Sequence, residues 1–191
     1  MSEWDIRFKG TIWTLEQQEQ QDGRIFELAR RTPGVRIMLV DNDKLLLNRE
    51  SRHELAGSYD LRLPGGKVFD SLEDWLQVRD DPDELVEAAV QAAAREMHEE
   101  CGVVIEPSDL RLLKRDINGG KGEWDLYYFH CSVFQLDPDG PAFSDTEAKE
   151  IDGWSWFDKE KARSQALDIE KGMSESRSAR YVAAWADGML E

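Results

Sequence analysis

The stretch Arg95-Glu96-Met97-His98-Glu99-Glu100-Cys101-Gly102-Val103 decides how the fold and the chemistry are interpreted. At about 100° per residue, the side chains of Glu96, Glu99 and Glu100 fall within an arc of about 100° on one helix face. Like charges at these spacings repel each other, so the cluster is unfavourable unless a cation lies against it. Mg²⁺ and Mn²⁺ prefer oxygen ligands. The stretch therefore predicts a metal site, and the alternative is a solvated acidic face.

The residues before this stretch predict a long helix. Asp81-Pro82-Asp83-Glu84 fits a capping box with Pro at the first helical position. Gly102 is suited to end the helix as the residue after its C-cap. Between these signals, apolar residues recur at helical spacing and form one stripe: Leu85, Ala88, Ala89, Ala92, Ala93 and Met97.

The rest of the chain alternates mostly with a period of two, which is typical of strands. The expected strands are 4–8 and 11–15 as an N-terminal hairpin, then 24–31, 35–40, 44–49, 59–63, 109–115, 123–134 and 151–157. The segment from Asp158 onward is expected to be helical, with Tyr181, Val182, Trp185 and Leu190 on its apolar side. Strands around one dominant helix, with a terminal helix, predict an α/β sandwich.

Composition excludes several classes of protein. The 191 residues carry 24 Lys and Arg against 40 Asp and Glu, a formal net charge of −16. Nucleic acids and anionic membrane surfaces are therefore not expected partners. The longest apolar run, 37–40, is far shorter than the roughly 20 residues of a transmembrane helix. The N-terminus shows no targeting signal, so a cytoplasmic location is expected. Cys101 and Cys131 lack zinc-site spacing and are expected to be small buried groups.

The acidic stretch, with Pro64-Gly65-Gly66 and Glu87 before it, resembles the Nudix box, Gx5Ex7REUxEExGU. The resemblance implies a Nudix-type α/β/α sandwich, a mixed β-sheet with flanking helices, plus an N-terminal β-hairpin. It divides the chain into N-terminal strands, 1–31, as a candidate dimerisation segment, and a Nudix hydrolase domain, 32–191.

One spacing departs from the family pattern. Gly66 precedes Glu87 by 21 residues instead of six, so 67–81 is an insertion. Glu87 falls inside the predicted helix, and Glu73, seven residues after Gly66, competes for its role. The insertion contains Trp75 among other apolar residues. It is either a short helix over the site or a surface excursion.

The resemblance also implies an activity: metal-dependent hydrolysis of a diphosphate linkage in a nucleoside diphosphate linked to another moiety, X. Mg²⁺, or Mn²⁺, would be held by Glu96, Glu99 and Glu100, with Arg95 orienting them. Glu99, Glu100, Glu147 and Glu150 are the candidates for catalytic carboxylates. The remaining candidates contact phosphate: the Gly65 and Gly66 backbone and the Lys67 ammonium. A simple tight turn is the other interpretation of the two glycines.

The N-terminal layout resembles the ADP-ribose pyrophosphatase branch of the family. Segments 8–13, 22–27 and 30–35 carry this likeness, and Arg52 lies where the branch places a substrate-binding arginine. The branch favours a nucleotide sugar as substrate and implies a homodimer. A Pro that the branch carries after the box is absent, because Asn118-Gly119-Gly120 lies there. The alternative function is a catalytically weak Nudix-fold module that binds nucleotides or regulates a partner.

Overall fold

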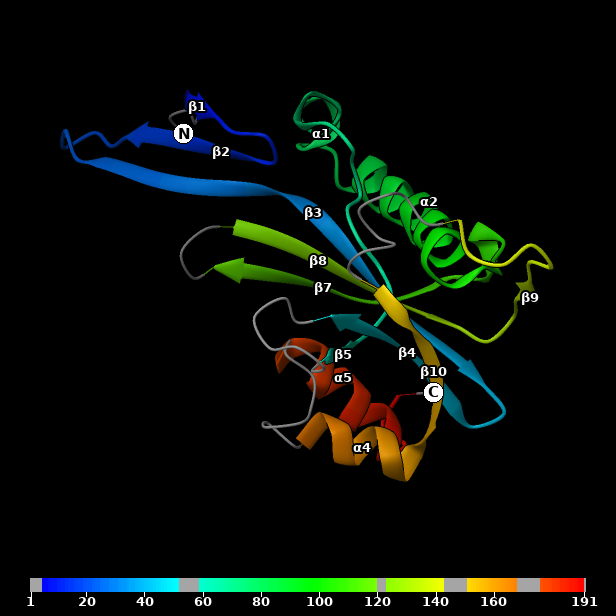
Figure 1. The fold of residues 1–191 in the computed structure, drawn as a ribbon. Coiled ribbons are helices and arrows are strands. Elements are labelled where there is room, and N and C mark those ends of the chain that lie inside the picture. Colours follow the sequence, from blue (N-terminus) through cyan, green and yellow to red (C-terminus); the bar gives the residue numbers. More distant parts are fainter. Residues whose placement is uncertain (1–4, 52–58, 120–122, 143–150, 168–175, 191) are drawn as a thin grey trace.

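The structure is a computed structural model, and it describes residues 5–51, 59–119, 123–142, 151–167 and 176–190 (Figure 1). A mixed β-sheet lies between two groups of helices. Helices α1 (Leu72–Val78) and α2 (Pro82–Cys101) cover one face, and α4 (Lys159–Leu167) and α5 (Ser176–Ala186) cover the other. The predicted α/β class, with a mixed sheet and helices on both sides, is confirmed.

Eight strands form the main sheet in the described residues. Their order is β1-β2-β3-β4-β10, with β5 paired to β4, and β8 paired to both β3 and β7. Only the β3–β8 pair is parallel among these pairings. The bounds are β1 (Asp5–Lys9), β2 (Trp13–Glu19), β3 (Ile25–Asp41), β4 (Lys44–Ser51), β5 (Tyr59–Arg62), β7 (Arg111–Gly119), β8 (Glu123–Cys131) and β10 (Ile151–Asp158). A second, small sheet pairs β6 (Val103–Val104) with β9 (Gln135–Leu136), and a 3₁₀ turn, η1, spans Pro107–Asp109.

Strand β3 corrects one expectation. Segments 24–31 and 35–40 were expected to be separate strands joined at Pro33-Gly34, but they form one strand. The β3–β8 register shifts between Arg31 and Gly34, so the Pro is accommodated at an irregularity of the ladder. The Pro33 carbonyl accepts from the Val68 N–H, so this point of β3 is tied to the segment that follows the two glycines.

Helix α2 begins and ends where the sequence predicts. The Asp81 side chain accepts from the Asp83 and Glu84 N–H groups, and Gly102 ends the helix with φ 63°. In a capping box the Glu84 side chain would also accept from the Asp81 N–H. That N–H instead donates to the Val78 carbonyl. The stop and start signals were therefore sufficient to place a 20-residue helix.

The insertion contains a short helix, α1. Ser71 caps its N-terminus, and Trp75 packs into the core against α2 with 6% of its surface exposed. At the end of the helix, Arg79 pairs with Glu16 of β2, whose side chain is fully buried and also accepts from Thr14. The insertion thus packs against the core and forms an ion pair with the N-terminal strands.

Two apolar cores lie on opposite faces of the sheet. The first joins β3, β4 and β8 to α1 and α2, and the second joins β3, β4, β8 and β10 to α4 and α5. Cys101 and Cys131 are both buried and unpaired by a disulfide, as expected. The helical C-terminal region is divided between α4 and α5. Among the described helices, none is long and apolar enough to cross a membrane.

Candidate active site

Two of the three acidic residues in the last two turns of α2 are buried against the sheet. Glu96 and Glu100, one helical turn apart, are each 7% exposed, whereas about a third of the Glu99 side chain remains exposed. Carboxylates are rarely buried unless they are paired or bind a metal. The burial of Glu96 and Glu100 distinguishes them from an ordinary solvated acidic face.

Hydrogen bonds hold the Glu100 carboxylate in place. Its Oε2 accepts from the Asn48 side-chain amide at 2.8 Å and from the Gly65 N–H at 2.8 Å. Asn48 is 2% exposed, and its Oδ1 accepts from the Cys101 thiol at 3.3 Å. Gly65, which was expected to offer its N–H to phosphate, therefore positions a carboxylate in this structure.

Asn48 is a site residue that the sequence analysis missed. It lies on β4 in Leu45-Leu46-Leu47-Asn48, where every second side chain faces α2. An amide at a core-facing position of an apolar strand was the available signal, because a buried polar group needs a partner.

The two glycines give the carboxylates room. A Cβ on Gly66 would lie 2.3 Å from Glu96 Oε2, so the carboxylate packs directly on the backbone. Gly65 has φ +136°, and a Cβ there would lie 2.3 Å from the Val35 carbonyl oxygen. Both glycines therefore approach the site closely, Gly65 through its N–H on Glu100 and Gly66 through its backbone beside Glu96.

Arg95 connects the carboxylates to the insertion. Its guanidinium lies 3.2 Å from a Glu96 oxygen and 3.6 Å from a Glu99 oxygen. It also donates to the Lys67 carbonyl at 2.8 Å. The structure thus brings Arg95, Glu96 and Glu99 together with the backbone of Lys67. The Lys67 residue itself is exposed.

The C-terminal end of α2 is tied to the segment after β9. His98 Nε2 lies 2.6 Å from an Asp137 carboxylate oxygen, and this hydrogen bond lowers the pKa of Asp137 below its usual value. The Asp137 N–H donates to the Gly102 carbonyl. These contacts fix the chain just before residues 143–150, which include two of the candidate carboxylates.

A divalent cation fits the chemistry of this region. Glu96 and Glu100 offer hard oxygen donors one turn apart, and their burial is otherwise costly. Within the described ranges, no group of three or more His, Cys, Asp or Glu side chains is close enough to share a metal ion. The partners of each carboxylate explain this, because Glu99 pairs with Arg95 while Glu100 turns toward Asn48 and Gly65.

Arg52, Glu147 and Glu150 lie outside the described residues. Glu87 is an exposed residue of α2, about 180° around the helix from Glu96. Glu73 is exposed in the first turn of α1.

Comparisons with known proteins agree with this architecture. A family model of the NUDIX domain matches residues 30–178. The structure described as "ADP compounds hydrolase" shares 20% identity, covers 98% of this chain and 94% of its own, and has a TM-score of 0.60. A NUDIX hydrolase from Nitrosomonas europaea shares 18% identity over 83% of this chain and 90% of its own, with a TM-score of 0.57. No curated protein sequence matches the chain. The two solved structures show a similar fold. The family model spans more than half of the chain. The protein therefore belongs to the NUDIX domain family, which supports its assignment as a pyrophosphohydrolase.

Proposed function

We propose that the protein hydrolyses the diphosphate linkage of a nucleotide sugar, with Mg²⁺ or Mn²⁺, to give a nucleoside monophosphate and a phosphorylated sugar. The observation that carries this proposal is the pair of nearly buried carboxylates, Glu96 and Glu100, held against Gly65 and Gly66. Nudix hydrolases generally use divalent metal ions. A cation bound by these residues would neutralise phosphate oxygens and lower the pKa of water.

The chain's own residues keep the site ready for that cation. The Gly65 N–H and the Asn48 amide fix Glu100, and the Gly66 backbone fixes the place of Glu96. Arg95 offsets part of the repulsion between Glu96 and Glu99. These contacts are all made within the chain, and they fix the positions of the carboxylates.

In the reaction, water attacks one phosphorus, the bridging P–O bond breaks, and the water proton is taken up by a base. Glu99 is a candidate for the base because it is more exposed than Glu96 and Glu100, its two neighbours in the cluster. Glu147 and Glu150 are the other candidates, from the segment before β10. The Lys67 ammonium and Arg52 are proposed to bind phosphate.

The test is a substrate panel with an active-site control. The panel contains ADP-ribose, other nucleotide sugars, dinucleoside polyphosphates, NADH, coenzyme A and deoxynucleoside triphosphates. We expect a nucleotide sugar to be cleaved fastest with Mg²⁺ or Mn²⁺, and nothing to be cleaved with EDTA; faster cleavage of another class would overturn the choice of substrate. Glu100→Gln should lower kcat by at least about a hundredfold, because several kcal/mol of charge stabilisation are lost. It should unfold nearly as the wild type does, because the Gln oxygen still accepts from Gly65.

Two results would contradict the proposal. Cleavage that continues in EDTA would exclude the metal-dependent mechanism. A folded protein that binds members of the panel, measured by ligand-induced thermal shift, but cleaves none of them would favour the binding module instead.

A further inference from the structure

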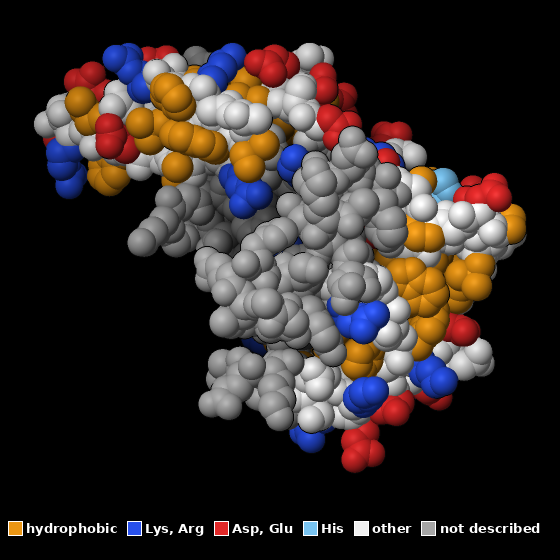
Figure 2. All heavy atoms as spheres, in the orientation of Figure 1, with side chains coloured by type: hydrophobic (Ala, Val, Ile, Leu, Met, Phe, Trp, Pro, Cys, Tyr) orange, Lys and Arg blue, Asp and Glu red, His pale blue; other side chains and the backbone are white. Residues whose placement is uncertain are grey.

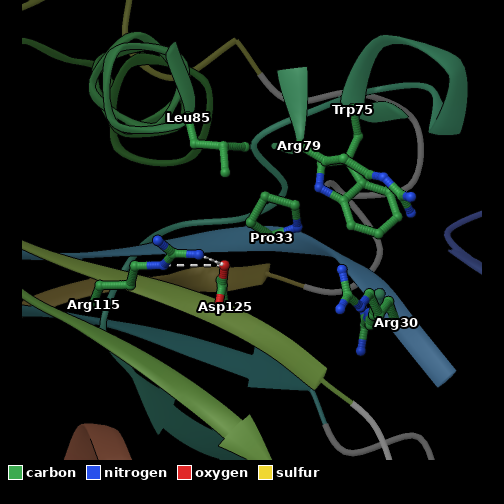
Figure 3. A pocket seen from close by; sticks show the side chains of 8 residues that line it. Arg30, Pro33, Trp75, Arg79, Leu85, Arg115 and Asp125 are labelled. Carbon is green, nitrogen blue, oxygen red and sulfur yellow. Dashed lines mark hydrogen bonds and ion pairs between the residues drawn. The ribbon is translucent and has the colours of Figure 1, made fainter. Parts of the chain in front are cut away.

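A small cavity lies on the α2 face of the sheet, at the N-terminal end of that helix (Figure 3). Arg115 and Asp125 rise from β7 and β8 below it, and Arg30 and Arg31 come from β3. Trp75 and Arg79 close it from the side of α1. Four arginines therefore surround a space with one carboxylate in its lining.

The concentration of cations is unusual for this chain. The protein carries a net charge of −16, yet a sixth of its 24 Lys and Arg residues line this one cavity. Arg115 pairs with Asp125, and Arg79 pairs with Glu16, which also has Arg30 at 3.6 Å. These carboxylates hold the Arg30, Arg79 and Arg115 guanidinium groups. Arginine forks held in this way suit an anion that accepts several hydrogen bonds.

The insertion builds one wall of the cavity. Both Trp75 and Arg79 belong to 67–81, the segment that lengthens the Nudix box. Trp75 is anchored in the core and Arg79 is anchored by Glu16, so this wall is part of the folded structure. The inserted residues thus account for a feature that the uninterrupted box would lack.

The cavity lies along the same side of α2 as the carboxylates. Leu85, which lines the cavity, and Glu96 are 11 residues apart. They therefore differ by about 20° around the helix and by about 16 Å along it. On the sheet, Pro33 lines the cavity, while Val35, two residues further, bonds to Gly66 beside Glu96. One extended ligand can reach both places.

The size of the cavity decides which part of a ligand fits. Its volume is about 110 Å³. This space exceeds the roughly 10–15 Å³ that a single water molecule requires. A single phosphate or carboxylate group fits there.

We propose that this cavity is a second anion subsite, which selects diphosphate substrates that carry a further anionic group, a phosphate or a carboxylate, at the end remote from the cleaved bond. The proposal rests on the proposed function, because it assumes that the diphosphate lies at Glu96 and Glu100. The inserted helix α1 is, on this view, a substrate-selecting element.

The test uses pairs of ligands that differ in one anionic group. NADPH and NADH differ by a phosphate, and UDP-glucuronate and UDP-glucose differ by a carboxylate. Calorimetric titration of the Glu100→Gln variant with Mg²⁺ measures binding with little turnover. We expect the more anionic member of one pair to bind about tenfold more tightly, the gain expected from a charge-assisted hydrogen bond. The pair that shows the preference identifies the group.

Two variants with opposite expected effects on the binding preference test whether the cavity causes it. Arg115→Gln should reduce the preference, and Asp125→Asn should increase it, because the only carboxylate in the described lining is then neutral. Loss of structure would weaken binding in both variants. Opposite changes in the preference therefore exclude loss of structure as the cause. Asp22→Asn and Arg24→Gln are the matched controls, because this exposed ion pair lies in the turn between β2 and β3. The controls should leave the preference unchanged.

Equal affinities within both pairs would overturn the subsite, as would a preference that neither Arg115→Gln nor Asp125→Asn alters. Hydrolysis with Mg²⁺ or Mn²⁺ is measured on the same four compounds and on the wider panel. A retained preference with no hydrolysis of any compound contradicts the proposed function alone. Hydrolysis without any preference contradicts the subsite alone.

Discussion

Gly65 and Gly66 are neighbours with different structural tasks, so the same substitution has different consequences at each. At Gly65, alanine meets the Val35 carbonyl oxygen and a φ of +136°. At Gly66, alanine meets only the end of the Glu96 side chain, which can rotate away. The backbone conformation therefore restricts Gly65, whose N–H also holds Glu100, whereas the space taken by the Glu96 carboxylate restricts Gly66.

We expect Gly65→Ala to lower the free energy of unfolding by about 1–3 kcal/mol, the usual cost of such backbone strain. Gly66→Ala should unfold nearly as the wild type does but need at least about tenfold more Mg²⁺ for half-maximal activity, because Glu96 is displaced. Urea denaturation and metal titration of the activity measure the two effects, and each variant serves as control for the other. Equal loss of stability in both variants would contradict the different constraints on Gly65 and Gly66.

Tyr127 carries a polar atom in the core. Its side chain is fully buried, and its hydroxyl has no hydrogen-bond partner among the described residues. Burial raises the pKa of Tyr127 to about 12, which outweighs the opposing effect of Arg115. Such a hydroxyl costs stability that a phenylalanine of the same shape would recover.

We expect Tyr127→Phe to raise the free energy of unfolding by about 1–3 kcal/mol at neutral pH. The pKa is raised on folding, so the neutral phenol favours the folded state, and this contribution declines as the pH rises from about 10 toward the folded value. Stability of the wild type should therefore fall by up to about 1.4 kcal/mol per pH unit more steeply there than that of the variant. Urea midpoints between pH 8 and 11 measure this. A destabilised variant would show that the hydroxyl has a partner.

At the scale of elements, helix α1 depends on one buried carboxylate. Glu16 of β2 is fully buried and pairs with Arg79, and Arg30 lies 3.6 Å away. Removing one partner of a buried pair leaves the other charge without compensation, whereas removing both is often much less costly. The Glu16–Arg79 pair therefore couples α1 to the N-terminal strands.

We expect Glu16→Gln to lower the free energy of unfolding by about 3 kcal/mol and Arg79→Gln to do nearly the same. The double variant should be more stable than the sum of the two losses predicts, by at least about 1 kcal/mol. Urea denaturation of the four proteins completes the cycle. Strict additivity would show that the two side chains do not act as a pair. The exposed pair Asp5–Arg7, at 2.9 Å, is the control, and its substitution should change little.

Sequence patterns predicted the elements whose signals are local. Asp81, Pro82 and Gly102 mark both ends of α2, and period-two segments locate most of the strands. The union of two predicted strands into β3 could not be predicted, because Pro33 normally interrupts a strand and only the pairing with β8 accommodates it. Tertiary pairing overrides local preference there.

The same distinction holds for the candidate site. The spacing of Glu96, Glu99 and Glu100 is a property of one helix, so it could be deduced from the chain alone. The support from Asn48, and the use of the Gly65 N–H by Glu100, join segments far apart in the sequence. The arginine cavity joins β3, β7, β8 and two helices, and no local pattern marks such a meeting.

At the scale of the whole molecule, the N-terminal strands project from the rest of the fold (Figure 1). Apolar side chains gather on this arm, defined here as residues 5–31, in the space-filling view (Figure 2). Its large exposed apolar residues are Phe8, Trp13, Ile25 and Phe26, from 40% to 62% exposed. Contiguous apolar surface of this kind usually marks an interface. A second copy of the chain is the partner we expect, as the resemblance to the ADP-ribose pyrophosphatase branch implies.

We expect the protein to sediment as a homodimer at micromolar concentration and Phe26→Glu to convert it to a monomer. A charge at a 48% exposed position is tolerated by the folded monomer but must be desolvated in an apolar interface. Met189→Glu is the matched control, because Met189 is 69% exposed near the C-terminus and lies outside the arm. A monomeric wild type would contradict the homodimer. A dimer that dissociates with Met189→Glu and persists with Phe26→Glu would move the interface to the C-terminal end.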